Sequence, residues 1–171
     1  MKCLRPRSRG LRWRLLAGAA AVVAAMTTLA PTASATSPQT ASGDFLLTSS
    51  VQTSSRDADD NTIVTETNSG LFFGTFTGSF TVRLTRVIHH LTFATFHGSG
   101  TFTGVVDGSA PGTADFVTQG TGSATAPQFE SRLETTGGGT GGLSNLHAQL
   151  TLILTPLTVP FGVYFGTYHF D

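Results

Sequence analysis

From residue 44 onward, apolar and polar side chains alternate in long runs with a period of two. In 71–88, Phe, Gly, Val and Leu hold one parity while Thr, Ser and Arg hold the other, and 91–106 repeats the pattern. Successive side chains of a strand point to opposite faces, so this alternation predicts strands with one apolar and one polar face. We expect eight strands, at 44–54, 61–68, 71–87, 91–106, 112–121, 128–136, 143–155 and 161–170.

The segments between these strands are short and rich in turn-forming residues. Asp59-Asp60-Asn61, Asp107-Gly108 and the run from Gly137 to Gly142 are the clearest examples. Short turns favour antiparallel strands that pair in chain order, and such a sheet loses its edges when it closes on itself. The sequence therefore predicts an all-β fold, a single antiparallel eight-stranded up-and-down β-barrel over 43–171. A two-sheet sandwich is the alternative.

Several glycines share the parity of the core phenylalanines. Glycine weakens a strand, so a run of them on the inner face needs a reason. Glycine permits the sharp coiling that long strands need in a small barrel. It also leaves volume inside, and an eight-stranded barrel can be filled by side chains or hold one small ligand. Both explanations stay open for Gly74, Gly78, Gly98, Gly100 and Gly104.

The first 35 residues have the order of an export signal. A basic segment (1–14) precedes an Ala-rich apolar segment (15–29), and Ala33-Ser34-Ala35 offers the small residues of a cleavage site. The apolar segment is shorter than the roughly 20 residues that span a bilayer. We therefore predict a cleaved secretory signal peptide (1–35), a disordered leader (36–42) and a secreted product with no membrane contact after cleavage.

Charge and cysteine content exclude several classes of protein. A chain starting at Thr36 holds four arginines, no lysine and ten acidic residues, so its net charge is −6. This composition excludes a basic nucleic-acid-binding surface. The one cysteine, Cys3, precedes the apolar segment, which excludes both a disulfide framework and a thiolate metal site in the barrel.

Few residues of the sequence are candidates for catalysis or for binding a metal or a phosphate. Only a turn could bring His89 and His90 together with Asp107, and the remaining histidines have no chelating spacing, so we predict no metal site and no cofactor. The glycine-rich run lacks the helix and the base of a phosphate loop. Glu66 and Arg86 share the inward parity, either inside the barrel or at its solvent-reaching rim. Catalytic residues stay unassigned.

One stretch resembles a known family. Gly138-Gly139-Thr140-Gly141-Gly142-Leu143 with Leu146-His147-Ala148 is similar to the glycine-rich segment of the allene oxide cyclase and dirigent barrels. An uncharacterised group of secreted bacterial proteins classed with that barrel shares the segment at 97–102 and the ending at 166–171. The resemblance implies an eight-stranded antiparallel barrel. The triplet lacks the family's arginine and glycine, so no catalytic residue is carried over.

These observations lead to three functional hypotheses. The first is a binding protein that holds a small apolar ligand inside the barrel. The second is a cyclase or isomerase that encloses a reactive apolar substrate, with Glu66 or a tyrosine as the polar partner. The third is a solid-core interaction or envelope protein, with a homo-oligomer face built from Leu71, Phe73, Phe161 and Phe165. The residues expected to line a ligand site in the interior are Phe76, Phe80, Phe96, Phe102, Glu66 and Tyr164.

Overall fold

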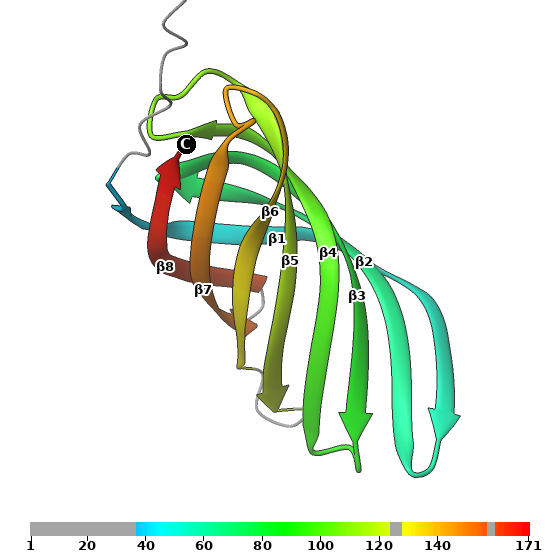
Figure 1. The fold of residues 1–171 in the computed structure, drawn as a ribbon. Helices are drawn as coiled ribbons and strands as arrows, with labels where there is room; N and C mark the ends of the chain where they lie inside the picture. Colours follow the sequence, from blue (N-terminus) through cyan, green and yellow to red (C-terminus); the bar gives the residue numbers. More distant parts are fainter. Residues whose placement is uncertain (1–36, 124–127, 157–159) are drawn as a thin grey trace, which may run out of the picture. The chain divides into compact units, whose positions relative to one another are not determined.

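The computed structural model describes residues 37–123, 128–156 and 160–171. The expected signal peptide and Thr36 lie outside these ranges. Within the described ranges, no helix is long and apolar enough to cross a membrane. The strands are β1 (Gln39–Ala58), β2 (Asn61–Gly74), β3 (Phe76–His89), β4 (Phe93–Val106), β5 (Gly112–Ser123), β6 (Phe129–Gly141), β7 (Leu146–Pro156) and β8 (Pro160–Phe170) (Figure 1).

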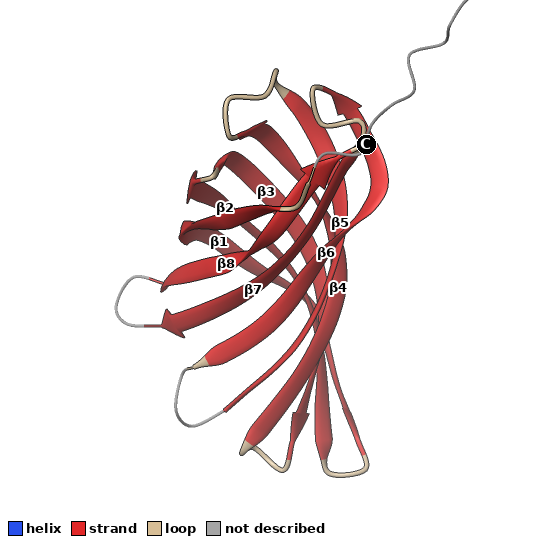
Figure 2. Cartoon of the chain, turned by 60° about the vertical axis from the view of Figure 1, so that its left-hand side comes forward, coloured by secondary structure: helices blue, strands red, loops and turns tan. Residues whose placement is uncertain are grey.

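The eight strands form one antiparallel sheet that closes on itself in chain order (Figure 2). Each strand pairs with the next, and β8 returns to pair with β1, where Tyr164 lies opposite Gly43. The predicted all-β class, strand number and up-and-down order are confirmed, and the two-sheet sandwich is wrong. Residues 43–46 of β1 have a partner strand on each side, because the register with β2 begins at Gly43 and that with β8 ends at Leu46.

The strand expected at 71–87 is wrong at its start. The structure assigns Leu71–Gly74 to β2, and the chain reverses at Thr75. Gly74 has a φ of 106°, in the region that favours glycine, so it is a turn residue and not one of the inward strand glycines. The alternation hid this turn because Phe72 and Phe76, on either side of it, both face the interior.

Two further expectations on connecting segments are wrong. The leader expected to be disordered at 36–42 is a strand from Gln39, because its backbone pairs with the end of β8 and Ala41 is fully buried. The glycine run expected as a turn at 137–142 continues β6 as far as Gly141. A register shift against β5 precedes this extension, and the turn follows at residues 142–145.

Glycines on the inner face lie opposite aromatic rings of the neighbouring strand. A Cβ atom on any of these glycines would overlap its partner's ring. The rings therefore occupy the volume opposite the glycines, as in the pairing of aromatic residues with strand glycines that stabilises designed sheets. The glycines permit the rings to lie flat against the sheet and do not themselves hollow the barrel. The pairs are Gly43–Tyr164, Gly70–Phe80, Gly100–Phe116, Gly120–Phe96, Gly122–Phe129 and Gly162–Phe45.

One end of the interior is filled by aromatic side chains. Phe72 and Phe76 contact Phe102 and Tyr164 with ring centroids 5.2–6.0 Å apart, mostly edge to face. The void among these residues measures about 10 Å³, too small for more than about one water molecule. The interior toward the β1–β2 and β3–β4 turns is different, and it holds the candidate site.

Candidate functional site

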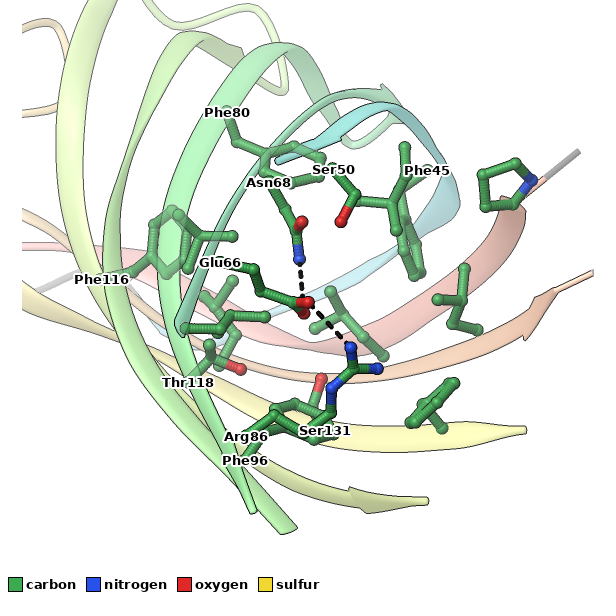
Figure 3. A pocket seen from close by; sticks show the side chains of 18 of the residues that line it. Phe45, Ser50, Glu66, Asn68, Phe80, Arg86, Phe96, Phe116, Thr118 and Ser131 are labelled. Atoms are coloured by element: carbon green, nitrogen blue, oxygen red, sulfur yellow. Dashed lines mark hydrogen bonds and ion pairs between the residues drawn. The ribbon is translucent and has the colours of Figure 1, made fainter. Parts of the chain in front are cut away.

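The other end of the interior contains a cavity of about 270 Å³ (Figure 3). Aromatic and aliphatic side chains from every strand form most of its wall, and Phe72, Phe116 and Leu133 line both this cavity and the small void of the filled end. A solid core throughout the described interior, the premise of the third hypothesis, is therefore wrong. The apolar part of the wall includes Phe45, Phe80, Val82, Leu84, Phe96, Phe116, Phe129, Leu133, Leu152 and Leu154.

Six polar side chains line this cavity: Ser50, Thr118 and Ser131, and a hydrogen-bonded group of Glu66, Asn68 and Arg86 (Figure 3). Nη2 of Arg86 donates a hydrogen bond to Oε2 of Glu66 at 2.9 Å, and Nδ2 of Asn68 donates to Oε1 of the same carboxylate at 3.3 Å. Glu66 and Asn68 share the inner face of β2 two residues apart, and Arg86 comes from β3, diagonally across from Glu66. Each carboxylate oxygen therefore accepts one hydrogen bond.

Glu66, Arg86 and Asn68 are buried to different degrees. The side chain of Glu66 is 10% exposed and that of Arg86 is 29% exposed. The ion pair therefore lies where the cavity meets solvent, with Asn68 deeper inside at 5% exposure. Of the two residues left between interior and rim, Glu66 faces the interior and Arg86 reaches the solvent-exposed rim.

Two buried polar atoms of this group have no hydrogen-bond partner among the described residues, Oδ1 of Asn68 and Nε of Arg86. The orientation of the Asn68 amide follows from its neighbour, because the carboxylate of Glu66 accepts and so requires the NH₂ group. Its carbonyl oxygen is left as an acceptor without a donor. An unsatisfied buried polar atom lowers stability by roughly 1–3 kcal/mol. This end of the barrel is therefore suited to a molecule with a polar group that can bind this atom.

The six residues predicted to line a ligand site divide between the two ends. Phe80, Phe96 and Glu66 line the cavity. Phe76, Phe102 and Tyr164 lie in the filled end and do not line the cavity. Sequence reasoning missed Asn68, because an asparagine in a Thr/Ser-rich strand gives no signal beyond its inward parity with Glu66.

The two tyrosines of β8 both point inward, a direction the sequence left open. Burial raises the pKa of Tyr164, although its hydrogen bond with the backbone of Phe76 opposes the shift and Asp44 adds to it. A hydrogen bond of 2.6 Å to Asp107 raises the pKa of Tyr168 to about 12, with burial as a second cause. Tyr168 thereby fixes the turn after β4 to the last strand.

The histidines considered as metal ligands lie apart. His89 hydrogen-bonds Asn61 and Thr95 near the β3–β4 turn, whereas Asp107 follows the opposite end of β4 and binds Tyr168. A metal site formed by His89, His90 and Asp107 is therefore wrong. A different group meets on the outer face, His147 and His169 on neighbouring strands with Asp171.

The outer face of β2, β1 and β8 carries exposed apolar side chains. Leu71 lies opposite Leu46, and Leu46 lies opposite Phe161, so the strand register makes the patch continuous. The four residues expected in an oligomer face, Leu71, Phe73, Phe161 and Phe165, all belong to these strands and are 37–51% exposed. Assembly through this face stays a prediction.

Comparisons with known proteins support the fold alone. The sequence matches no protein-family model and no curated protein. A crystal structure of a protein of unknown function from the DUF3224 family of Shewanella oneidensis is similar, with a TM-score of 0.64 and 12% sequence identity. The match covers 79% of this chain and 99% of that protein. At this identity the likeness extends to the all-β architecture and not to a site.

Proposed function

We propose that this chain is a secreted binding protein whose barrel holds a small, mainly apolar molecule that carries a hydroxyl group. The observation that supports the proposal best is the apolar cavity of about 270 Å³ with Asn68 Oδ1 left without a donor inside it. Because a cavity of 150 Å³ holds benzene, this volume suits on the order of ten non-hydrogen atoms. Medium-chain alcohols and small terpenoid alcohols have this size and polarity.

The charges at the site favour a neutral polar group. The guanidinium of Arg86 already contacts Glu66 at 2.9 Å, so the pair has no net charge to offer an incoming ion. A carboxylate ligand would bring a second negative charge beside Glu66 in a partly dehydrated space, which is costly. A hydroxyl group instead donates to Asn68 Oδ1, and its own oxygen remains available as an acceptor.

Export and fold type are parts of the same proposal. The basic, apolar and small-residue segments at 1–35 support secretion. The similarity of 138–148 to the allene oxide cyclase and dirigent barrels, and of 97–102 to the bacterial group classed with them, supports that type of closed barrel. The resemblance supplies no catalytic residue.

The test is a calorimetric titration of the purified protein with three ligands of matched length, 1-decanol, decyl methyl ether and decanoate. The ether accepts but does not donate a hydrogen bond. We expect decanol to bind with one-to-one stoichiometry and about five- to tenfold more tightly than the ether, since one hydrogen bond contributes about 1 kcal/mol. Decanoate should bind most weakly.

Two variants test whether Asn68 causes the preference for decanol. Asn68→Leu should remove the preference for decanol and leave the ether affinity nearly unchanged. Thr118→Val is the matched control, because Thr118 also lines the cavity but its hydroxyl already donates to the backbone of Arg132. Failure of all three ligands to bind would end the proposed function. Equal binding of alcohol and ether would refute the hydroxyl preference alone.

Catalysis by Glu66 is the second candidate, because an ionisable side chain does reach the cavity. A cyclase or isomerase would need this carboxylate to exchange a proton with the substrate. Its two oxygens accept hydrogen bonds from Asn68 and Arg86, and a proton gained from the substrate would weaken these bonds. Binding without chemistry requires no such change, and we therefore favour it.

A further inference from the structure

We infer that His147, His169 and Asp171 form a binding site for a divalent transition metal, with zinc as the first candidate, on the outer face of the barrel. This site is separate from the cavity and does not depend on the proposed function. His147 on β7 lies directly opposite His169 on β8, and Asp171 follows the end of β8. Two imidazoles and one carboxylate are a common ligand set for zinc with an open position.

The three side chains already converge. Nε2 of His147 is 2.8 Å from Oδ2 of Asp171, and Nε2 of His169 is 3.6 Å from Oδ1 of the same carboxylate. One potential ligand atom from each residue lies within 4.8 Å of the others. In a tetrahedral zinc site with bonds of about 2.0–2.1 Å, ligand atoms are about 3.3 Å apart. The observed distances of 2.8 and 3.6 Å therefore lie on either side of the ligand spacing that a zinc ion requires.

The backbone holds the ligands in place. The two imidazole rings stack with centroids 4.9 Å apart and an interplanar angle of 12°, as their opposed positions in the β7–β8 ladder dictate. Asp171 is fixed by Asn145, since the amide of Asp171 donates to the Asn145 carbonyl and the Asn145 side chain donates back to the Asp171 carbonyl, each at 3.2 Å. Small side-chain rotations are therefore enough to close the site.

The charge balance also suits a cation. The carboxylate contributes one negative charge, and neutral imidazoles contribute lone pairs. Binding would replace the hydrogen bond between His147 and Asp171 with bonds to the metal, and the Nε2 proton of a neutral His147 would move by exchange with water to Nδ1. The side chains of His147 and His169 are 44% and 33% exposed, so an ion can reach them from solvent. Water would complete the coordination sphere.

The experiment is a titration of tag-free protein with Zn²⁺ by calorimetry, repeated with Co²⁺ and read by its visible absorption, which reports coordination geometry. We expect one ion per chain, imidazole coordination and a rise in thermal stability with metal concentration. His147→Gln, His169→Gln and Asp171→Asn should each weaken binding at least about tenfold, because each removes one of three ligands.

His97→Gln is the matched control, since His97 is an exposed histidine on the outer face of β4. Circular dichroism checks that every variant keeps the wild-type fold. No saturable binding by the wild-type protein would overturn the inference, and so would an equal loss in the His97 variant or unchanged affinity in the His169 variant. In that case the three residues form only a surface ion pair.

Discussion

The phenol oxygen of Tyr164 accepts a hydrogen bond of 2.8 Å from the backbone nitrogen of Phe76, although the two residues are 88 positions apart. The same hydroxyl donates to the carbonyl of Phe73 at 3.2 Å. A side chain of β8 thereby satisfies backbone groups on both sides of the turn between β2 and β3. This contact joins β8 to the β2–β3 turn at the aromatic-filled end of the barrel, and Tyr164 does not line the cavity.

Tyr164→Phe should lower the free energy of unfolding by about 1–3 kcal/mol, because the buried amide of Phe76 loses its acceptor. Urea denaturation of wild-type and variant proteins measures this difference. The variant should still bind decanol normally, since Tyr164 does not line the cavity. An unchanged unfolding free energy would show that this contact does not stabilise the turn.

The stability of the barrel should fall as pH rises from about 10 to about 12. The folded state holds the Tyr168 proton up to a pKa of about 12, whereas a tyrosine in the unfolded chain titrates near 10. Its contribution is therefore complete below pH 10 and is lost as pH approaches 12. Lys2 is the only lysine, so few other side chains titrate in this pH range, and the absorbance change follows the ionisation of Tyr164 and Tyr168.

Asp107→Asn should bring the Tyr168 pKa down toward 10 and flatten this alkaline loss of stability. Asparagine tolerates the left-handed backbone of Asp107, which has a φ of 46°. The substitution therefore removes the charge while preserving the turn. A pKa that stays near 12 in this variant would assign the shift to burial instead of the hydrogen bond.

Removing one member of the Glu66–Arg86 ion pair should lower the free energy of unfolding more than removing both members. Glu66→Met leaves Arg86 without its partner, and we expect a loss of about 1–3 kcal/mol, less than for a fully buried pair because Arg86 is partly exposed. Glu66→Met/Arg86→Met should recover most of that loss. Thermal unfolding of the two single variants and the double variant gives the coupling energy, and simple additivity would contradict the account.

A methyl group at Gly122 should destabilise the protein only while the opposite ring is present. A Cβ at this position would overlap the Phe129 ring, and the three nearest atoms all belong to it. Gly122→Ala should cost about 1–3 kcal/mol in the wild-type background. In a Phe129→Leu background the same change should be nearly neutral, and an equal cost in both backgrounds would refute the glycine–aromatic pairing.

Alternation predicted the strands well because each strand has one buried and one exposed face. It failed at Gly74–Thr75, where the residues on both sides of a tight turn face the interior and the parity runs on without a break. It failed again at 137–141, since a glycine run is equally compatible with a turn and with a bulged strand. Local composition does not distinguish these cases; pairing with a distant strand does.

The candidate sites were harder to predict than the fold. Parity placed Phe76 and Phe80 on the same inner face but gave no information on which end of the barrel would be filled. The pairing of Glu66 with Arg86 depends on the β2–β3 register, and that of His147 with His169 on the β7–β8 register. The spacing of His169 and Asp171, two residues apart at the end of β8, was the local signal of the histidine group.

The most direct test of the ligand-binding account is an isotope-filtered nuclear Overhauser experiment on the labelled protein with unlabelled 1-decanol. The account predicts contacts between the alkyl protons and the rings of Phe80, Phe96 and Phe116, which line the cavity, and none to Phe76 or Phe102 in the filled end. Contacts confined to Phe161 and Phe165 on the outer face, or no contacts at saturating decanol, would contradict it.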